Sequence, residues 1–304
     1  MAKGNIVQLD SVKQYNDAWG IETLHPLVSV LDLTSRPDEM PLESTTTYGL
    51  YALWLKESRS CDVQYGRQSY DYDKGTIMCF APGQTVHTKY HPEDGAPRCY
   101  GLLFHPDLLR GTNLGRTIKS YTFFSYSVHE ALHASDEERA IILDCLRKIQ
   151  GELRHSIDTH SRKIIVMNIE LLLGYCMRFY ERQFITREVH NHDTLTKFEA
   201  LLDEYFEGNN AAKNGIPTVK YFAEHVFLSP NYFGDLIKKE TGRTPQEYIQ
   251  DKVVETAKQL IADSNETVSE ISYSLGFRYP QHFCRLFKKR VGMTPQQYRK
   301  QLAV

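Results

Sequence analysis

Residues 233–248, FGDLIKKETGRTPQEY, and residues 283–298, FCRLFKKRVGMTPQQY, are two copies of one pattern that decides the fold of the C-terminal third of the chain. At a constant offset of 50 residues, the copies share a phenylalanine, a leucine, a Lys-Lys pair, a glycine, a Thr-Pro-Gln triplet and a tyrosine. Self-similarity at a fixed spacing is typical of a structural unit that occurs more than once. The sequence therefore predicts two equivalent units.

The segment before each copy also repeats, at an offset of 49 residues. Residues 218–226 and 267–275 each begin with Thr-Val and continue with apolar or small residues at helical spacing. The change of offset from 49 to 50 predicts one extra residue in or beside the turn of the second copy. A short helix, a tight turn and a second helix form a helix-turn-helix, so we expect two such units, at about 218–242 and 267–292.

The second helix of each unit is predicted to have a buried face and an exposed face. The buried face consists of Phe233, Leu236 and Ile237 in the first unit and Phe283, Leu286 and Phe287 in the second. On the exposed face, Gln and Arg side chains can bond base edges, and Lys can bind phosphates. The candidate DNA-binding residues are Asn231, Gly234, Asp235, Lys238 and Lys239 in the first unit, and Pro280, Gln281, His282, Cys284, Arg285, Lys288 and Lys289 in the second.

Positive charge is concentrated locally rather than spread over the chain. The formal net charge is −2, and from Asp193 onward there are 15 Lys and Arg against 14 Asp and Glu. Residues 278–290, however, hold five basic residues and no acidic one. Such a strip is typical of a surface that contacts a nucleic-acid backbone. The near-neutral chain as a whole argues against indiscriminate DNA packaging, which needs a far more basic protein.

On the duplicated unit, and above all on residues 271–298 (ISYSLGFRYPQHFCRLFKKRVGMTPQQY), the chain resembles the AraC/XylS family of bacterial transcription regulators. The resemblance covers about residues 195–302. It implies a leading helix at 195–207, a linking helix at 245–263, and two recognition helices that enter successive major-groove segments of double-stranded DNA, about 34 Å apart. It also favours an activator, which would contact RNA polymerase.

Two residues on the exposed face of the first recognition helix are poorly suited to contact DNA. Gly234 has no side chain, and the carboxylate of Asp235 is repelled by phosphates, although it could accept a hydrogen bond from cytosine N4. We therefore expect the second unit, through Gln281 and Arg285, to contribute at least as much to sequence specificity as the first.

Residues 24–109 contain short apolar or alternating runs broken by turn residues, a pattern that is typical of antiparallel β structure. The runs are HPLVSVLDL (25–33), YGLYALWLKES (48–58), VQYGRQSYDY (63–72), GTIMCFAPG (75–83) and RCYGLLFHP (98–106). The predicted fold class is α+β: an antiparallel barrel at about 24–110, two helices, then an all-α domain. The family resemblance implies that the barrel is cupin-like and senses a small-molecule effector; the candidate pocket residues are Tyr51, Trp54, Tyr65, His87 and Tyr100.

Two helices are predicted within residues 135–183. The first begins at Ser135, which with Glu138 forms a capping box. The second, about 161–183, has one apolar face of Ile165, Ile169, Leu172, Cys176 and Phe179, and beside it another of Ile164, Met167, Leu171 and Tyr175. A helix with two apolar faces packs on its own domain with one and on a further surface with the other, so we expect a homodimer. A deeply buried helix would show the same pattern.

The polar, aperiodic stretch 187–194 predicts a boundary between a sensor and dimerisation domain, 1–190, and a DNA-binding domain, 193–304. Residues 1–20 lack the apolar core of a secretory signal, and no segment is long and apolar enough to span a membrane. The six cysteines, at positions 61, 79, 99, 145, 176 and 284, form no CxxC pair. We expect a cytoplasmic protein with reduced, mostly buried thiols and no cofactor.

Two other classes of protein share parts of this pattern. A cupin metalloenzyme would use His87, His91 and Glu93 as ligands, but three residues separate the two histidines where one is expected, so we expect no metal and no catalysis. A DNA-repair protein of the alkyl-accepting kind would need an activated cysteine beside a zinc-type cluster, and no such cluster is visible. The regulator interpretation is preferred.

Overall fold

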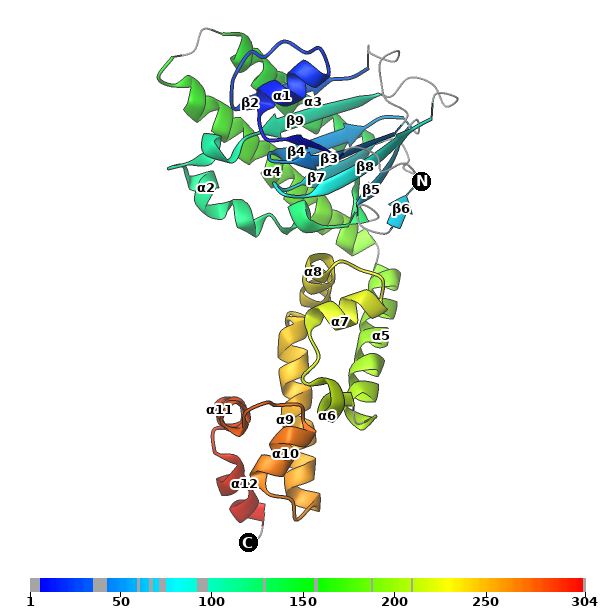
Figure 1. Cartoon of the computed structure of the whole chain (residues 1–304), viewed down its shortest axis with the longest axis vertical. Coiled ribbons are helices and arrows are strands. Elements are labelled where there is room, and N and C mark those ends of the chain that lie inside the picture. Colours follow the sequence, from blue (N-terminus) through cyan, green and yellow to red (C-terminus); the bar gives the residue numbers. More distant parts are fainter. Residues whose placement is uncertain are drawn as a thin grey trace. The chain divides into compact units, whose positions relative to one another are not determined.

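The computed structural model describes residues 6–34, 43–58, 61–65, 68–70, 75–91, 98–127, 130–155, 158–186, 188–208 and 210–302, with backbone alone for 61–70 and 188–190. The chain divides into two compact units, Met1–Thr186 and Arg187–Val304. The first contains both β sheets and the second consists of helices, so the predicted α+β fold class is confirmed (Figure 1). None of the described helices combines the length and apolar character that crossing a membrane requires.

The first unit contains two five-stranded sheets. One has the order β1-β3-β8-β5-β6 and comprises Ile6–Leu9, Glu43–Tyr48, Thr85–Tyr90, Cys61–Tyr65 and Gln68–Tyr70. The other has the order β10-β7-β4-β9-β2 and comprises Leu132–His133, Thr76–Phe80, Tyr51–Lys56, Cys99–Phe104 and Val28–Asp32. All pairings are antiparallel, as expected, except that β1 runs parallel to β3.

The apolar runs predicted as strands contain β2, β4, β6, β7 and β9 and overlap β5. The sequence pattern missed β8, β10 and three elements nearer the N-terminus. Strand β3 reads ESTTTY, so its threonine methyls supply the apolar side of a strand that looks polar. The other two, β1 and helix α1 (Val12–Ala18), precede the predicted start of the barrel at residue 24. Ser11 caps α1 through a capping box with Gln14, and α1 buries Val12 and Tyr15 in the core of the β sandwich.

Successive side chains of a strand point to opposite faces of its sheet, and this alternation fixes the core. The interior contains Leu31 and Leu33 from the β2 segment, Tyr48 at the end of β3, Trp54 from β4, Met78 and Phe80 from β7, Val86 from β8 and Leu103 from β9. Gly101 of β9 is required there, because a Cβ at this position would lie 2.4 Å from the indole of Trp54. The aromatic ring of Trp54 therefore lies directly on the backbone of β9.

Helices α3 (Asp136–Arg154) and α4 (Ser161–Thr186) pack against each other and against the sheet that contains β2 and β10. The chain reaches them through η2 (Pro106–Leu109), α2 (Asn113–Thr117), η3 (Ile118–Ser120) and η4 (Thr122–Ser125). The predicted capping box of Ser135 and Glu138 is confirmed. So is the buried face of α4, which contains Ile165, Ile169, Leu172, Cys176 and Phe179.

The second unit contains eight helices among its described residues: α5 (Glu188–Glu207), α6 (Asn210–Asn214), α7 (Val219–His225), α8 (Pro230–Thr241), α9 (Pro245–Asp263), α10 (Val268–Ser274), α11 (Pro280–Val291) and α12 (Pro295–Leu302). The linking helix has the predicted bounds 245–263. The expectation of an irregular stretch at 187–194 is wrong, because α5 begins at Glu188, well before the predicted start at residue 195. The first part of α5 consists mostly of polar residues, so it shows no apolar helical pattern. Asn191 within it is nevertheless buried and donates a hydrogen bond to Glu240 of α8.

Two glycines with a left-handed backbone provide a matched test of the packing in the second unit. Gly242 ends α8 at φ 73° and has open space around it, whereas Gly276 lies at φ 87°, and a Cβ added there would lie within 2.7 Å of backbone atoms of Gly215 and Ala211. A left-handed L residue costs about 1 to 2 kcal/mol. We expect Gly242→Ala to lower the free energy of unfolding by this amount, and Gly276→Ala by about 1 to 3 kcal/mol more, because it also overpacks the backbone.

Urea unfolding followed by the far-ultraviolet circular dichroism of the helices measures both losses. Equal losses for the two variants would contradict the close backbone contact at Gly276.

Candidate nucleic-acid interface and effector cavity

The first helix of each repeated unit is fixed by the same local chemistry. The Thr218 hydroxyl accepts a hydrogen bond from the backbone N–H of Tyr221 at the start of α7. Thr267 does the same at the start of α10, and the Glu270 carboxylate accepts in return from the Thr267 N–H at 2.7 Å, which lowers the pKa of Glu270. Ala223 and Ser272, the small residues at the fifth position of each helix, are fully buried. The two units therefore begin alike.

The turns of the two units differ by the one residue that the change of offset predicted. Val226 to Leu228 separate α7 from the N-cap Ser229 of α8, whereas four residues, 275–278, separate α10 from the N-cap Tyr279 of α11. Both turns pass through a left-handed residue, Phe227 at φ 60° in the first unit and Gly276 at φ 87° in the second. The extra residue is therefore in the turn of the second unit.

The recognition helices α8 and α11 bury the faces that the apolar pattern predicted. Phe233, Leu236 and Ile237 are buried in α8, and Phe283 and Phe287 are buried in α11, where Leu286 is partly buried. Phe233 contacts Phe198 of the leading helix α5, with ring centroids 5.2 Å apart. On α11, the same face packs on Val253, Val254 and Ala257 of α9. The opposite faces of both helices are turned away from the core.

The predicted DNA-binding residues fall into two groups according to their exposure. Asn231, Lys238 and Lys239 of α8 are exposed, and so are Gln281, His282, Arg285, Lys288 and Lys289 of α11. Four others are only partly exposed: Gly234, Asp235, Pro280 and Cys284. Cys284 packs against the apolar core around α9, and its burial raises the pKa of its thiol. Cys284 is therefore an uncharged residue at the edge of the exposed face of α11. Among the side chains described, α11 thus presents the larger set of exposed polar groups.

One residue of the predicted positive strip, Arg290, binds side chains of α9. Its guanidinium donates to Gln250 of α9 at 2.8 Å and pairs with the carboxylate of Asp251 at 3.3 Å. Asp251 also pairs with Arg243, in the segment that joins α8 to α9, and Arg243 lies 5.0 Å over the ring of Tyr248. Sequence reasoning missed this network because Arg243 and Asp251 are eight residues apart and Arg290 is on a different helix. Arg278, Arg285, Lys288 and Lys289 remain as the exposed cations of the strip.

Helix α9 sets the distance between the two units. It has 19 residues, so at 1.5 Å per residue it is about 28 Å long. Figure 1 shows both recognition helices nearly end-on, α8 beside the first end of α9 and α11 beside its middle, where Val253, Val254 and Ala257 pack against α11. One turn of B-DNA spans about 34 Å, and two recognition helices held on one rigid scaffold are the arrangement that can enter adjacent major-groove segments of a duplex.

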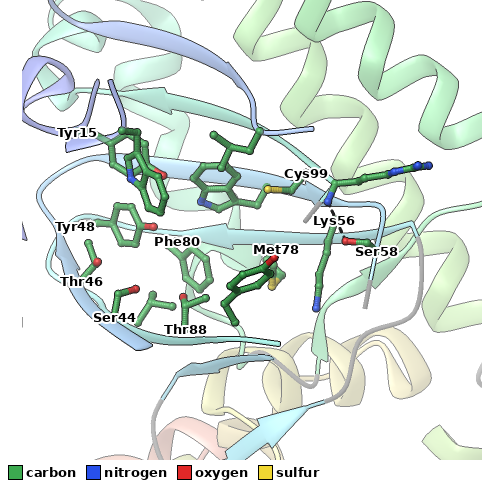
Figure 2. A pocket seen from close by; sticks show the side chains of 16 residues that line it. Tyr15, Ser44, Thr46, Tyr48, Lys56, Ser58, Met78, Phe80, Thr88 and Cys99 are labelled. Atoms are coloured by element: carbon green, nitrogen blue, oxygen red, sulfur yellow. Dashed lines mark hydrogen bonds between the residues drawn. The ribbon is translucent and has the colours of Figure 1, made fainter. Parts of the chain in front are cut away.

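A cavity lies between the two sheets of the compact unit Met1–Thr186. Side chains of both sheets and of α1 line it, with Tyr15, Tyr48, Trp54, Met78 and Phe80 among them, together with Lys56, Ser58 and Arg98. Figure 2 shows Tyr15 and Tyr48 on one side of the cavity and Lys56 and Ser58 on the other. The cavity therefore has aromatic side chains on one side, with Lys56 and Ser58 on the other.

The five residues expected to line a pocket do not all meet there. Trp54 lines the cavity, and the side chain of Tyr65 is outside the described residues. Tyr51, His87 and Tyr100 are not among the side chains that line this cavity, and Tyr51 lines a second hollow together with Pro106 and Leu109. Tyr51 stacks on Phe104 with ring centroids 5.0 Å apart, and His87 Nδ1 lies 3.0 Å from the hydroxyl of Thr45.

The metalloenzyme alternative gains no support from this geometry. His87 faces away from the cavity, because its neighbours Val86 and Thr88 line it and alternate residues of a strand share a face. Glu93 is outside the described residues. Within the described part of the chain, no three or more His, Cys, Asp or Glu side chains come together as metal ligands would.

Comparison with known proteins supports the helix-turn-helix assignment. A sequence family described as "Helix-turn-helix domain" matches residues 222–301. The uncharacterized HTH-type transcriptional regulator YobQ of Bacillus subtilis (strain 168) is 41% identical over 61 residues, which are 20% of this chain and 25% of that protein. The probable transcriptional regulator LumQ of Photobacterium leiognathi is 32% identical over 77 residues, 25% of this chain and 30% of LumQ.

Among solved structures, a transcriptional regulator from Chromobacterium violaceum, described as an AraC-type DNA-binding domain-containing protein, is 21% identical. The match covers 38% of this chain and 96% of that one, with a TM-score of 0.32. The chain spans less than a third of the length of its two curated relatives, and the family match lies wholly within the second unit. The second unit of this chain contains a helix-turn-helix domain.

Proposed function

We propose that the protein is a sequence-specific DNA-binding transcription regulator, acting in the cytoplasm. The observation that carries this proposal is the pair of helix-turn-helix units that pack on one 19-residue helix. Each unit turns a polar helix face away from the core, and the α11 face carries Gln281, Arg285 and Lys288. Activation through RNA polymerase is part of the proposal on family resemblance alone.

The two helix-turn-helix units have unequal exposed polar faces, and this supports a larger role of the second helix-turn-helix in recognising the DNA sequence. On α8, Gly234 and Asp235 occupy the middle of the exposed face, and Asn231 and Lys238 flank them. On α11, Gln281 and Arg285 lie four residues apart, one helical turn, so both can reach bases of one groove segment. We expect one chain to bind an asymmetric site with its strongest base contacts in one half.

The test is selection of genomic DNA fragments by the purified protein, followed by footprinting at physiological ionic strength. We expect protection of an asymmetric site of about two helical turns per protomer, with a large specificity ratio over random DNA. Equal binding of all fragments, in the presence and absence of small-molecule extracts, would contradict the proposal.

Arg285 and Arg290 provide a matched pair on one helix. Arg285 is exposed and forms no ion pair with the part of the chain that the structure describes, whereas Arg290 is held by Asp251 and Gln250. We expect Arg285→Ala to weaken binding to the selected site by about 1 to 3 kcal/mol, with a smaller effect on random DNA and none on folding. Arg290→Ala removes the same charge but should mainly lower stability, by under about 1 kcal/mol, because its ion pair is partly exposed.

Fluorescence anisotropy with the selected site and a scrambled duplex measures the affinities, and thermal unfolding measures the stabilities. A loss of folding in Arg285→Ala, or an equal loss of specificity in both variants, would contradict the placement of Arg285 on the contact surface.

We further propose that the protein is a homodimer formed through its N-terminal compact unit, Met1–Thr186. Three apolar side chains on one side of α4 are exposed at i, i+3 and i+7, namely Ile164 at 41%, Met167 at 58% and Leu171 at 46%. The opposite side of α4 is buried in the same unit. Water contact with such a stripe is unfavourable by roughly 25 cal/mol per Å² of apolar surface, so a second copy of α4 is a suitable cover.

Met167→Glu tests this contact. It places a charge at the most exposed point of the stripe, and we expect it to shift the protein from dimer to monomer in sedimentation velocity without unfolding it. Lys13→Glu, which changes an exposed residue of α1, is the control and should leave the dimer intact. A wild-type chain that sediments as a monomer would contradict the proposal.

We also propose that a small molecule in the cavity between the sheets acts as the effector. The cavity lies in the unit that precedes the DNA-binding domain, and six of its lining side chains are aromatic. Such enclosed, largely apolar clefts with a few polar groups are the usual form of a small-molecule site.

A further inference from the structure

Two arginines lie at the C-terminal ends of the two recognition helices, and each is held in an ion pair. Arg243 follows Gly242, the C-cap of α8, and Arg290 lies in the last turn of α11. Both helices also carry an exposed Lys-Lys pair in the same last turn. Lysine and arginine in such places contact phosphates, which accept a large share of all protein–DNA hydrogen bonds. If they were released, the two arginines would therefore add phosphate contacts.

Asp251 of α9 binds both arginines. Its carboxylate pairs with Arg243 and, at 3.3 Å, with Arg290. Each arginine also has a second contact: Arg290 donates to the side-chain oxygen of Gln250 at 2.8 Å, and the guanidinium of Arg243 lies 5.0 Å over the ring of Tyr248. An isolated surface ion pair is weak, but a network of charges holds its members more firmly. Asp251 is the centre of such a network.

A second carboxylate balances the charge of this network. Glu247 lies one helical turn before Asp251 on α9. Hydrogen bonds from the N–H and hydroxyl of Thr244 lower the pKa of Glu247, and the positive charges of Arg290 and Arg243 lower it further. Two carboxylates therefore lie beside two guanidinium groups. This balanced network attracts phosphates less than two released arginines would.

The direction of Arg290 agrees with a residue that is kept away from DNA. Five residues separate it from Arg285, and at about 100° per residue the two side chains point about 140° apart around α11. When Arg285 faces the bases, Arg290 is turned toward its partners on α9. Base contacts fix this orientation on a specific site. On random DNA no base contact fixes it, so a released arginine could reach the nearest phosphate.

We propose that Asp251 is a positioning residue for DNA specificity, which keeps Arg243 and Arg290 away from phosphates and so keeps binding to random DNA weak. This inference rests on the proposed DNA-binding function and deepens it by naming a residue that limits non-specific affinity. Phosphate contacts carry non-specific binding, and each one steepens the fall of log affinity with log salt concentration by about 0.9. Specificity is the ratio of affinities for the site and for random DNA, so lower random affinity raises it.

Asp251→Asn tests the proposal, because it keeps the shape of the side chain and removes its charge. The full-length protein is titrated with the selected site and with a scrambled duplex, by fluorescence anisotropy at several salt concentrations. For the scrambled duplex we expect a slope steeper by about 0.9 to 1.8, from one or two added phosphate contacts, and about fivefold tighter binding or more at physiological ionic strength. Binding to the selected site should tighten less, so the specificity ratio falls. An unchanged slope would overturn the proposal.

Asp263→Asn is the matched control. Asp263 is an exposed acid at the end of the same helix, and it forms no ion pair with the residues that the structure describes. Its loss changes the net charge equally but releases no arginine, so we expect the slope and the specificity ratio of the wild type. An equal change in both variants would reveal an effect of net charge alone and would overturn the role of Asp251.

A double variant tests the proposal without altering Asp251. Arg243→Gln combined with Arg290→Gln removes both cations, and since neither is proposed to contact phosphate, the salt slope on random DNA should stay at the wild-type value. A slope shallower by about 0.9 or more would mean that these arginines contact DNA in the wild type, against the proposal. Thermal unfolding checks the folding of each variant, and the double variant decides the question if Asp251→Asn does not fold.

The proposed DNA-binding function fails separately from the role of Asp251. A wild-type chain that prefers no DNA fragment would contradict sequence-specific regulation, while the slopes on random DNA would still test Asp251. A wild-type chain with a large specificity ratio, together with an unchanged slope in Asp251→Asn, would retain the regulator and overturn the role of Asp251.

Discussion

The contact on which the DNA-binding domain depends is the packing of α9 against both helix-turn-helix units. Near its start, the ring of Tyr248 lies 5.7 Å from Phe198, which also contacts Phe222 and Phe233 of the first unit. Further along, Val253, Val254, Ala257 and Ile261 are buried against α10 and α11. Each fully buried aliphatic side chain contributes about 1.5 to 3 kcal/mol, so the surface ion pairs around Asp251 are secondary. The rigid helix between the two clusters, rather than any single ion pair, holds the recognition helices at a fixed distance.

The sequence was most informative where one apolar pattern occurred twice. The match of residues 233–248 with 283–298 predicted both recognition helices, their buried faces and the extra residue of the second turn, because buried side chains must recur at the helical period whatever lies outside them. Exposed positions carry no such constraint. The sequence therefore could not show that Arg290 turns back to Asp251, since two segments distant in sequence meet only after α9 and α11 have packed.

The compact unit Met1–Thr186 was predicted less fully, for a different physical reason. Short strands alternate between two faces, and which face points inward depends on pairing partners that a single sequence does not reveal. Tyr51, His87 and Tyr100 are aromatic or polar strand residues just as Trp54 is, and none of the three lines the cavity. The threonine strand β3 and the N-terminal α1 were missed because neither has a strongly apolar run, yet both contribute side chains to the cavity.

The proposed regulation requires that a ligand bound in the compact unit Met1–Thr186 change the DNA affinity of the compact unit Arg187–Val304. In sequence, only residue 187 separates α4, with its exposed stripe, from α5, which leads the first helix-turn-helix unit. A single residue spans at most about 3.6 Å, so the end of α4 and the start of α5 stay close along the chain in any arrangement of the two units. Ligand binding changes DNA affinity only if it differs between two arrangements of these helices. A small molecule held between the sheets would have to act on α4 through the elements that separate them; the short strand β10 lies between the two, since it pairs with β7, which lines the cavity, and contacts α4.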